Sequence, residues 1–111
     1  MHELSITQGI IEICEKTACG KRVLTLAVEI GELCGVVPEA IEFCFEACSS
    51  GTLLEGAQLR IIRTPGRGVC ISCNALTPMK NLFDSCEKCG GHTITVQSGE
   101  EMRVMEIEVE E

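Results

Sequence analysis

The stretch "CISCNALTPMKNLFDSCEKC", residues 70–89, places two C-x2-C pairs twelve residues apart. Two such pairs can offer four thiolates to one tetrahedral metal ion. Asn74 and Gly90 directly follow the two pairs, and both residue types tolerate the positive φ that a metal-binding knuckle requires. The stretch therefore predicts a structural zinc site, without an open coordination position, at Cys70, Cys73, Cys86 and Cys89.

Other chemistries of the same cysteines fit less well. Neither C-x2-C pair opens a helix within a βαβ pattern, as a redox pair would. Iron sites of the rubredoxin type use the same ligands, but their cores are usually rich in aromatic residues, and this chain has three Phe and no Tyr or Trp. His92 follows Cys89 by three residues and could replace a ligand, although we expect it to be an exposed loop residue.

The zinc stretch belongs to a segment in which glycine and proline are frequent and apolar residues are few. Residues 65–93 offer little material for a hydrophobic core, so we interpret them as an inserted module that needs a metal to fold. We place this inserted zinc-binding domain at residues 65–98 and the other domain at residues 1–64 and 99–111.

Outside the inserted module, the apolar spacing predicts two helices and three strands. Steps of three and four residues indicate a helix over 4–19, and a second helix lies within 35–51, with Pro38 in its first turn. Apolar and polar residues alternate over 23–33, 57–64 and 101–111, as in strands with one buried face. The alternation changes phase between Val104 and Met105, which suggests a bulge or a strand start that is buried on both faces. The fold class is therefore α+β.

The bulk composition limits the partners and the compartment. A formal charge of −8 and a pI near 4.7 disfavour nucleic acid as a partner. We expect no signal peptide and no membrane span, hence a cytoplasmic protein whose nine cysteines bind metal rather than form disulfides. Among the remaining cysteines, we expect Cys14, Cys44 and Cys48 to be buried and Cys19 and Cys34 to be accessible. Cys44 and Cys48 are one helical turn apart and could share a metal.

The chain begins Met1-His2-Glu3, which raises a second metal question. A free Met1 amine, the deprotonated amides of His2 and Glu3 and the His2 imidazole can approach a square-planar set of nitrogens. That geometry suits Ni(II) or Cu(II) rather than zinc. A histidine at the second position of a helix start is weak evidence by itself, so the sequence of this segment leaves both readings open.

Several segments together resemble the hydrogenase-maturation nickel metallochaperones of the HypA/HybF family. They are "MHELSI" (1–6), "EIGELCGVVPEAIEFCFE" (29–46), "GTLLEGAQL" (51–59), the two cysteine pairs and "SGEEMRVMEIEVE" (98–110). The resemblance implies two helices packed on a small mixed three-stranded sheet, with an inserted zinc-ribbon module. It also implies nickel binding through His2, with Met1 and Glu3 as neighbours, and zinc at the four cysteines.

The resemblance further implies transfer of nickel to the [NiFe]-hydrogenase large-subunit precursor with a partner nickel-binding GTPase, and in some organisms service to urease. The chain has no G-x4-G-K-[ST] loop, so it is not itself that GTPase. The exposed face of the first helix, with Glu12 and Glu15, is a candidate docking surface for the GTPase. With two histidines and no Ser/His/Asp set, we expect no enzyme.

Two alternatives stay open from the residues alone. One is a zinc-ribbon protein-interaction or regulatory module without a nickel function, for which His2 would be irrelevant. The other is a thiol redox enzyme, which would form a disulfide readily and would not hold zinc tightly.

Overall fold

The computed structural model of the chain describes residues 3–111, and these residues divide into two compact units. The first unit comprises residues 1–29, 36–62 and 103–111, and the second comprises residues 30–35 and 63–102. The elements in chain order are α1 (Glu3–Ala18), β1 (Val23–Gly31), α2 (Pro38–Cys48), β2 (Gln58–Thr64), β3 (Gly66–Cys70), β4 (Leu76–Met79), β5 (Ile94–Ser98) and β6 (Met102–Val109).

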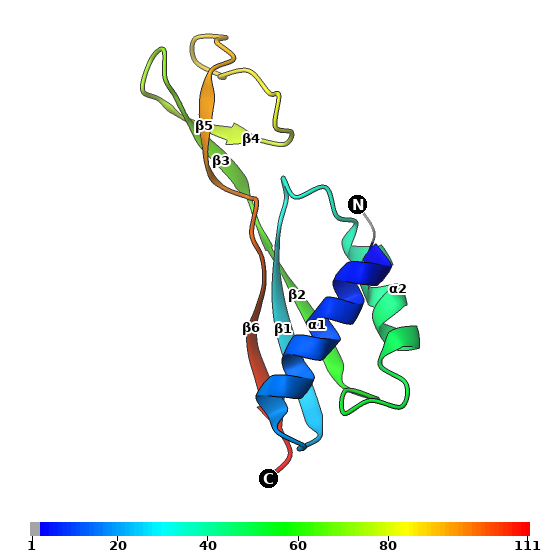
Figure 1. Cartoon of the computed structure of the whole chain (residues 1–111). Coiled ribbons are helices and arrows are strands. Elements are labelled where there is room, and N and C mark those ends of the chain that lie inside the picture. Colours follow the sequence, from blue (N-terminus) through cyan, green and yellow to red (C-terminus); the bar gives the residue numbers. More distant parts are fainter. Residues whose placement is uncertain (1–2) are drawn as a thin grey trace. The chain divides into compact units, whose positions relative to one another are not determined.

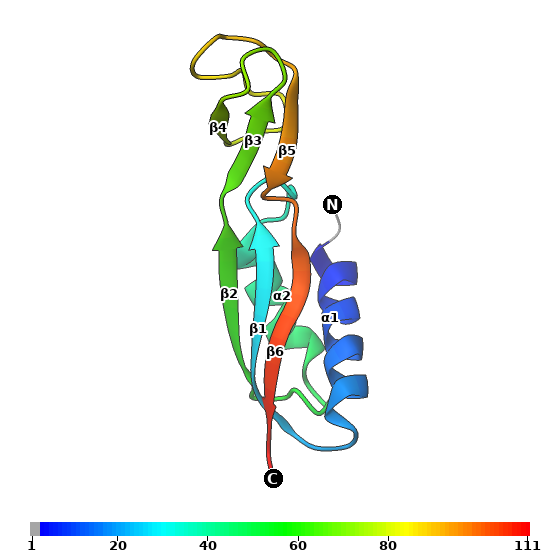
Figure 2. The same cartoon turned by 90° about the vertical axis from the view of Figure 1, so that its left-hand side faces the viewer.

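Both helices lie against one face of a three-stranded sheet with the order β2-β1-β6 (Figure 1). In this sheet β1 and β2 run in the same direction and β6 runs opposite to them (Figure 2). The predicted fold class, two helices on a small mixed sheet, is therefore confirmed. None of the helices within residues 3–111 has the length and apolar character that crossing a bilayer demands.

The helix α1 buries one stripe of its surface, as its sequence spacing predicts. Its buried residues include Ile10, Ile11, Cys14 and Ala18. Glu3 in the first turn and Lys16 in the last turn both complement the helix dipole. The helix ends where Cys19 and Gly20 adopt positive φ values of 52° and 86°.

The interior face of α2 differs from the expected one. Ile41 and Phe45 are buried, whereas Cys44 and Cys48 are only half-buried. The expectation that these two cysteines are fully buried is therefore wrong. Ile41 and Phe45 are four residues apart, so they occupy the same side of the helix and leave the two cysteines at the margin of that side.

The strands follow their predicted alternation only in part, because Ala27 of β1 is buried together with its neighbours Leu26 and Val28. Leu26, Val28 and Ile30 of β1 are buried, while Leu24 near the start of the strand is 45% exposed. In β6 the alternation is interrupted at Met105 and Glu106, which are both exposed. The interruption lies where the sequence pattern changes phase.

The second unit is built on an antiparallel sheet with the order β4-β3-β5. Gly66 is opposite Met79 and Val69 is opposite Leu76, and the pairing of β3 with β5 shifts between Arg67 and Gly68. The buried apolar residues of this unit are few, namely Ile30, Leu33, Cys70, Met79 and Cys86. Two of the five are predicted zinc ligands, which agrees with a unit that needs a metal to fold.

Three glycines allow the backbone segments of the second unit to cross at very close range. A Cβ on Gly31 would overlap the carbonyl oxygen of Gly99, and a Cβ on Gly99 would lie 2.6 Å from Cα of Gly66 and 3.0 Å from the Leu33 side chain. Two hydrogen bonds fix the crossing, from Gly31 N to Glu101 O at 2.7 Å and from Leu33 N to Gly99 O at 2.7 Å. We call Gly31, Gly66, Gly99 and Leu33 the glycine crossing.

Candidate metal centre

The structure brings the four predicted zinc ligands together. The Sγ atoms of Cys70, Cys73, Cys86 and Cys89 all lie within 4.8 Å of one another, and no other group of three or more His, Cys, Asp or Glu within residues 3–111 forms a comparable cluster. Cys70 Sγ is 3.5 Å from Cys89 Sγ, and Cys73 Sγ is 3.7 Å from Cys86 Sγ. His92 is exposed and is not a member of the cluster.

Two backbone turns of the same kind position the two cysteine pairs. In the first turn Asn74 N donates to Cys70 O at 2.7 Å, and in the second Gly90 N donates to Cys86 O at 2.9 Å. Asn74 and Gly90 have positive φ values of 61° and 76°, as the sequence predicts. The second turn also directs N–H groups at sulfur, because Lys88 N lies 3.4 Å from Cys86 Sγ and Gly91 N lies 3.4 Å from Cys89 Sγ.

The electrostatics of the cluster favour a cation. The backbone N–H groups of Cys89 and Lys88 lower the pKa of the Cys86 thiol to about 7. The Gly91 N–H acts in the same direction on Cys89, but the neighbouring thiols outweigh it and raise the pKa of Cys89 to about 12. Four thiols this close together cannot all ionise unaided, since each negative charge opposes the next. A divalent cation removes this opposition.

The donor set and the spacing fit zinc. Four sulfurs at the usual Zn–S distance of about 2.3 Å in a tetrahedron are separated by about 3.8 Å. The two closest Sγ pairs, at 3.5 and 3.7 Å, are near that separation. Such a centre leaves no coordination position for a substrate, so zinc bound there is structural.

The second predicted metal site lies at the chain start, and two of its three residues, Met1 and His2, are outside the described residues. Glu3 is the first residue of α1. Its carbonyl oxygen accepts a hydrogen bond from Thr7 Oγ1 at 2.7 Å, and its carboxylate faces Val37 N at 3.5 Å. As the first helical residue, Glu3 has an amide N–H without an acceptor in the helix ladder.

No pattern in the sequence indicates that Glu3 makes these two contacts. Thr7 is fully buried, and Val37 is the N-cap residue of α2, whose apolar side chain makes no capping hydrogen bond. The Val37 amide donates to the carboxylate of Glu3, which is 34 positions earlier in the chain. Contacts between residues so far apart follow from the packing of the helices and have no local sequence pattern.

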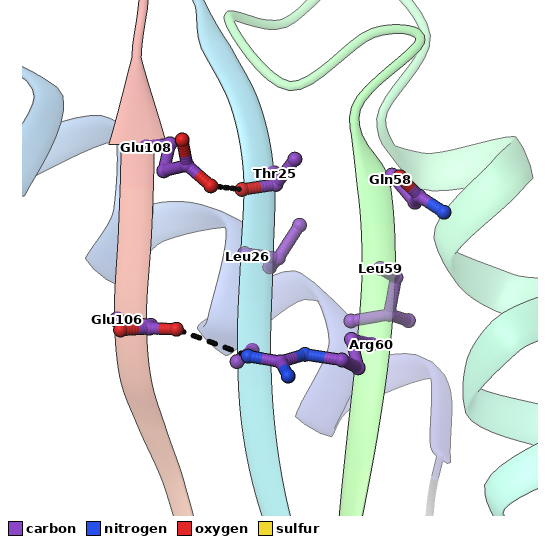
Figure 3. Close-up of a pocket in the computed structure, with 8 residues that line it drawn as sticks. Thr25, Leu26, Gln58, Leu59, Arg60, Glu106 and Glu108 are labelled. Atoms are coloured by element: carbon purple, nitrogen blue, oxygen red, sulfur yellow. Dashed lines mark hydrogen bonds and ion pairs between the residues drawn. The ribbon is translucent and has the colours of Figure 1, made fainter.

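A shallow groove lies on the sheet face that the helices leave uncovered. Its volume is about 260 Å³, and the polar part of its lining comes from Thr25, Gln58, Arg60, Glu106 and Glu108. Arg60 of β2 reaches over β1 to Glu106 of β6 at 3.0 Å, and Thr25 donates to Glu108 at 3.0 Å (Figure 3). These two pairs join neighbouring strands, so we interpret the groove as part of the sheet structure rather than as a binding site.

The fold and the four-cysteine centre define a small α+β metal-binding protein with a zinc-ribbon unit. The family model described as "Hydrogenase/urease nickel incorporation, metallochaperone, hypA" matches residues 1–109. The chain belongs to this family, the HypA nickel metallochaperones, which is a family of metal-delivery proteins and not of enzymes.

Individual relatives agree with this assignment. Hydrogenase maturation factor HypA of Geobacter sulfurreducens is 59% identical over 110 residues, which is 99% of this chain and 100% of the relative. The same factor of Geobacter metallireducens is 61% identical over the same shares. A solution structure of the Ni metallochaperone HypA from Helicobacter pylori superimposes with a TM-score of 0.69 at 25% identity, covering 98% of this chain and 97% of that one.

Proposed function

We propose that this chain binds Ni(II) at its N-terminus and delivers it, with a partner GTPase, to the [NiFe]-hydrogenase large-subunit precursor. The proposed ligands are the Met1 amine, the His2 imidazole and the backbone nitrogens of His2 and Glu3. The family description includes urease, so urease is a second possible recipient. We place this activity in the cytoplasm, with nickel bound by residues 1–64 and 99–111 and zinc by residues 65–98.

The anchoring of Glu3 is the observation that supports this proposal. A metal site at a chain terminus needs an anchored residue beside it and nitrogen atoms that are free to bind the ion, and Glu3 offers both. Its carboxylate accepts a hydrogen bond from Val37 N, and its carbonyl oxygen accepts one from Thr7 Oγ1. Its own amide N–H has no acceptor within the helix. A terminal site of this kind can also release its ion, because protonation or a competing partner can displace the exposed nitrogens.

Nickel titration of four protein forms tests the proposal. We expect the zinc-loaded, untagged wild type to bind one Ni(II) with the absorption spectrum of square-planar nitrogen coordination. His2→Ala and a form with two residues added ahead of Met1 should each lose at least about tenfold in affinity, because each loses a donor. His92→Ala is the matched control and should bind as the wild type does, since His92 is the other histidine of the chain.

The alternatives give different results in the same preparation. Equal binding by all four forms would exclude the N-terminal site and leave the zinc-ribbon interaction module as the better reading. Metal analysis of the purified protein separates the redox reading, because a thiol redox enzyme would contain little zinc and would form a disulfide readily.

A further inference from the structure

The outward face of α2 combines an exposed aromatic ring with three carboxylates. Phe43 is 78% exposed, although a side chain of this kind is usually buried. Glu39, Glu42 and Glu46 precede or follow it by four, one and three positions, so all three lie within about 100° of arc from Phe43 on the helix surface. We call Glu39, Glu42, Phe43 and Glu46 the α2 acidic face.

Contacts within the chain do not account for this face. None of the three carboxylates has a hydrogen-bond or ion-pair partner within residues 3–111, and α2 contains no Lys or Arg. Glu39 lies in the first turn, where the helix dipole favours an acid. Glu46 lies near the other end, where the dipole disfavours an acid, and no nearby cation offsets it.

The first helix offers a weaker candidate surface. Glu15 of α1 is half-buried, and its carboxylate accepts a hydrogen bond from Leu53 N at 3.2 Å. Glu15 therefore supports the fold and is not free to meet a partner. The α2 acidic face carries three carboxylates that make no such contact, as well as an exposed aromatic residue, which α1 lacks.

We propose that the α2 acidic face is the docking surface for a Lys/Arg-rich segment of the partner GTPase, with Phe43 inserted into an apolar pocket of the GTPase beside that segment. This inference rests on the proposed function, which supplies the partner. Charge complementarity indicates a positively charged partner segment. The first unit has five Lys and Arg against twelve Asp and Glu, whereas the second unit has four against five. Phe43 gives the anchor, since an aromatic side chain that fills a pocket often carries much of the binding energy.

Binding of the purified GTPase to immobilised, zinc-loaded full-length chain tests the inference by surface plasmon resonance at several salt concentrations. Phe43→Ala should raise Kd at least about tenfold, mainly through faster dissociation. The double variant Glu42→Lys, Glu46→Lys should slow association about tenfold at low salt and flatten the salt dependence. Both variants change exposed side chains only, and circular dichroism should confirm that they fold.

Two matched controls accompany these variants. Phe83→Ala removes a 91% exposed ring from the second unit, and Glu110→Lys reverses an exposed charge elsewhere in the first unit. Both should bind within about twofold of the wild type, as expected for residues outside the contact. Wild-type binding with unchanged Kd in both α2 variants overturns the docking surface and leaves the proposed function intact. Failure of the wild type to bind the GTPase overturns the partnership and the docking surface together.

Discussion

Cys14 shows at the level of one residue how burial controls thiol chemistry. Its side chain is fully buried in α1, and burial raises the pKa of its thiol to about 11. Iodoacetamide reacts with the thiolate, so at pH 8 it should label the exposed Cys19 and spare Cys14 in the zinc-loaded protein. Mass spectrometry of the peptides checks this, with the same reaction in denaturant as the control in which both cysteines react. Rapid labelling of native Cys14 would contradict the packing of α1.

The sequence predicts the fate of some cysteines better than others. The burial of Cys14 follows from its position on a stripe that repeats every three or four residues. In α2 the same argument fails, because Ile41 and Phe45 compete with Cys44 and Cys48 for the interior and win it through their larger apolar area. A periodicity argument identifies the buried side of a helix only to within one residue around the circumference.

Among the backbone elements, the glycine crossing should be the least tolerant of added atoms. Gly99→Ala would place a methyl group against Gly66 and Leu33 at a φ of 109°, so we expect about 2–4 kcal/mol of lost stability from overlap and backbone strain together. Gly35→Ala is the matched control, because Gly35 also has a positive φ, of 75°, but has open space around it. Urea unfolding and amide exchange at Leu33 measure the difference. Similar losses of stability in Gly99→Ala and Gly35→Ala would show that strain in φ, and not steric overlap, accounts for the cost at Gly99.

The strands of the two sheets differ in how well the sequence predicts them. Hydrophobic alternation marks β1, β2 and β6, and all three were expected from it. The sequence "GRGVC" of β3 has no such alternation, and Pro78 in β4 argues against a strand, although β4 is an edge strand, where proline is tolerated. Ile94 and Val96 alternate with Thr95 and Gln97 in β5, so this strand could have been found. Turns around the four-cysteine cluster connect the strands of this sheet, and few of its side chains are both apolar and buried.

At the scale of the whole molecule, removal of zinc should affect the two units unequally. The second unit has few buried apolar side chains besides the ligands themselves, so Cys73→Ala should unfold residues 65–93. Helix α1 and the sheet β2-β1-β6 should survive, because α1, α2 and β1 supply their own core. Hydrogen exchange read by mass spectrometry would show the loss of protection in β3 and β4, with Cys19→Ala as the control. Equal loss of protection in α1 would mean that the two units fold as one.

The division of the charge between the units is likewise a property of the whole molecule. The sequence supplies the total of −8, but the assignment of most of it to the first unit requires the contacts that define the units. The four-cysteine cluster was predictable from its spacing because the ligands are close in the chain. The contact of Glu3 with Val37 was not, because it joins residues that only the packing of two helices brings together.

The order of the strands in the sheet also determines when each strand can pair during synthesis. The central strand β1 is made early, but its neighbour β6 comprises the last regular residues of the chain. All four clustered cysteines are synthesised before β6, and domains generally fold as units while synthesis proceeds. During translation, the edge of β1 that pairs with β6 therefore stays unpaired until β6 has been made. A released chain truncated before residue 102 would contain all four clustered cysteines, but β1 would lack its partner β6.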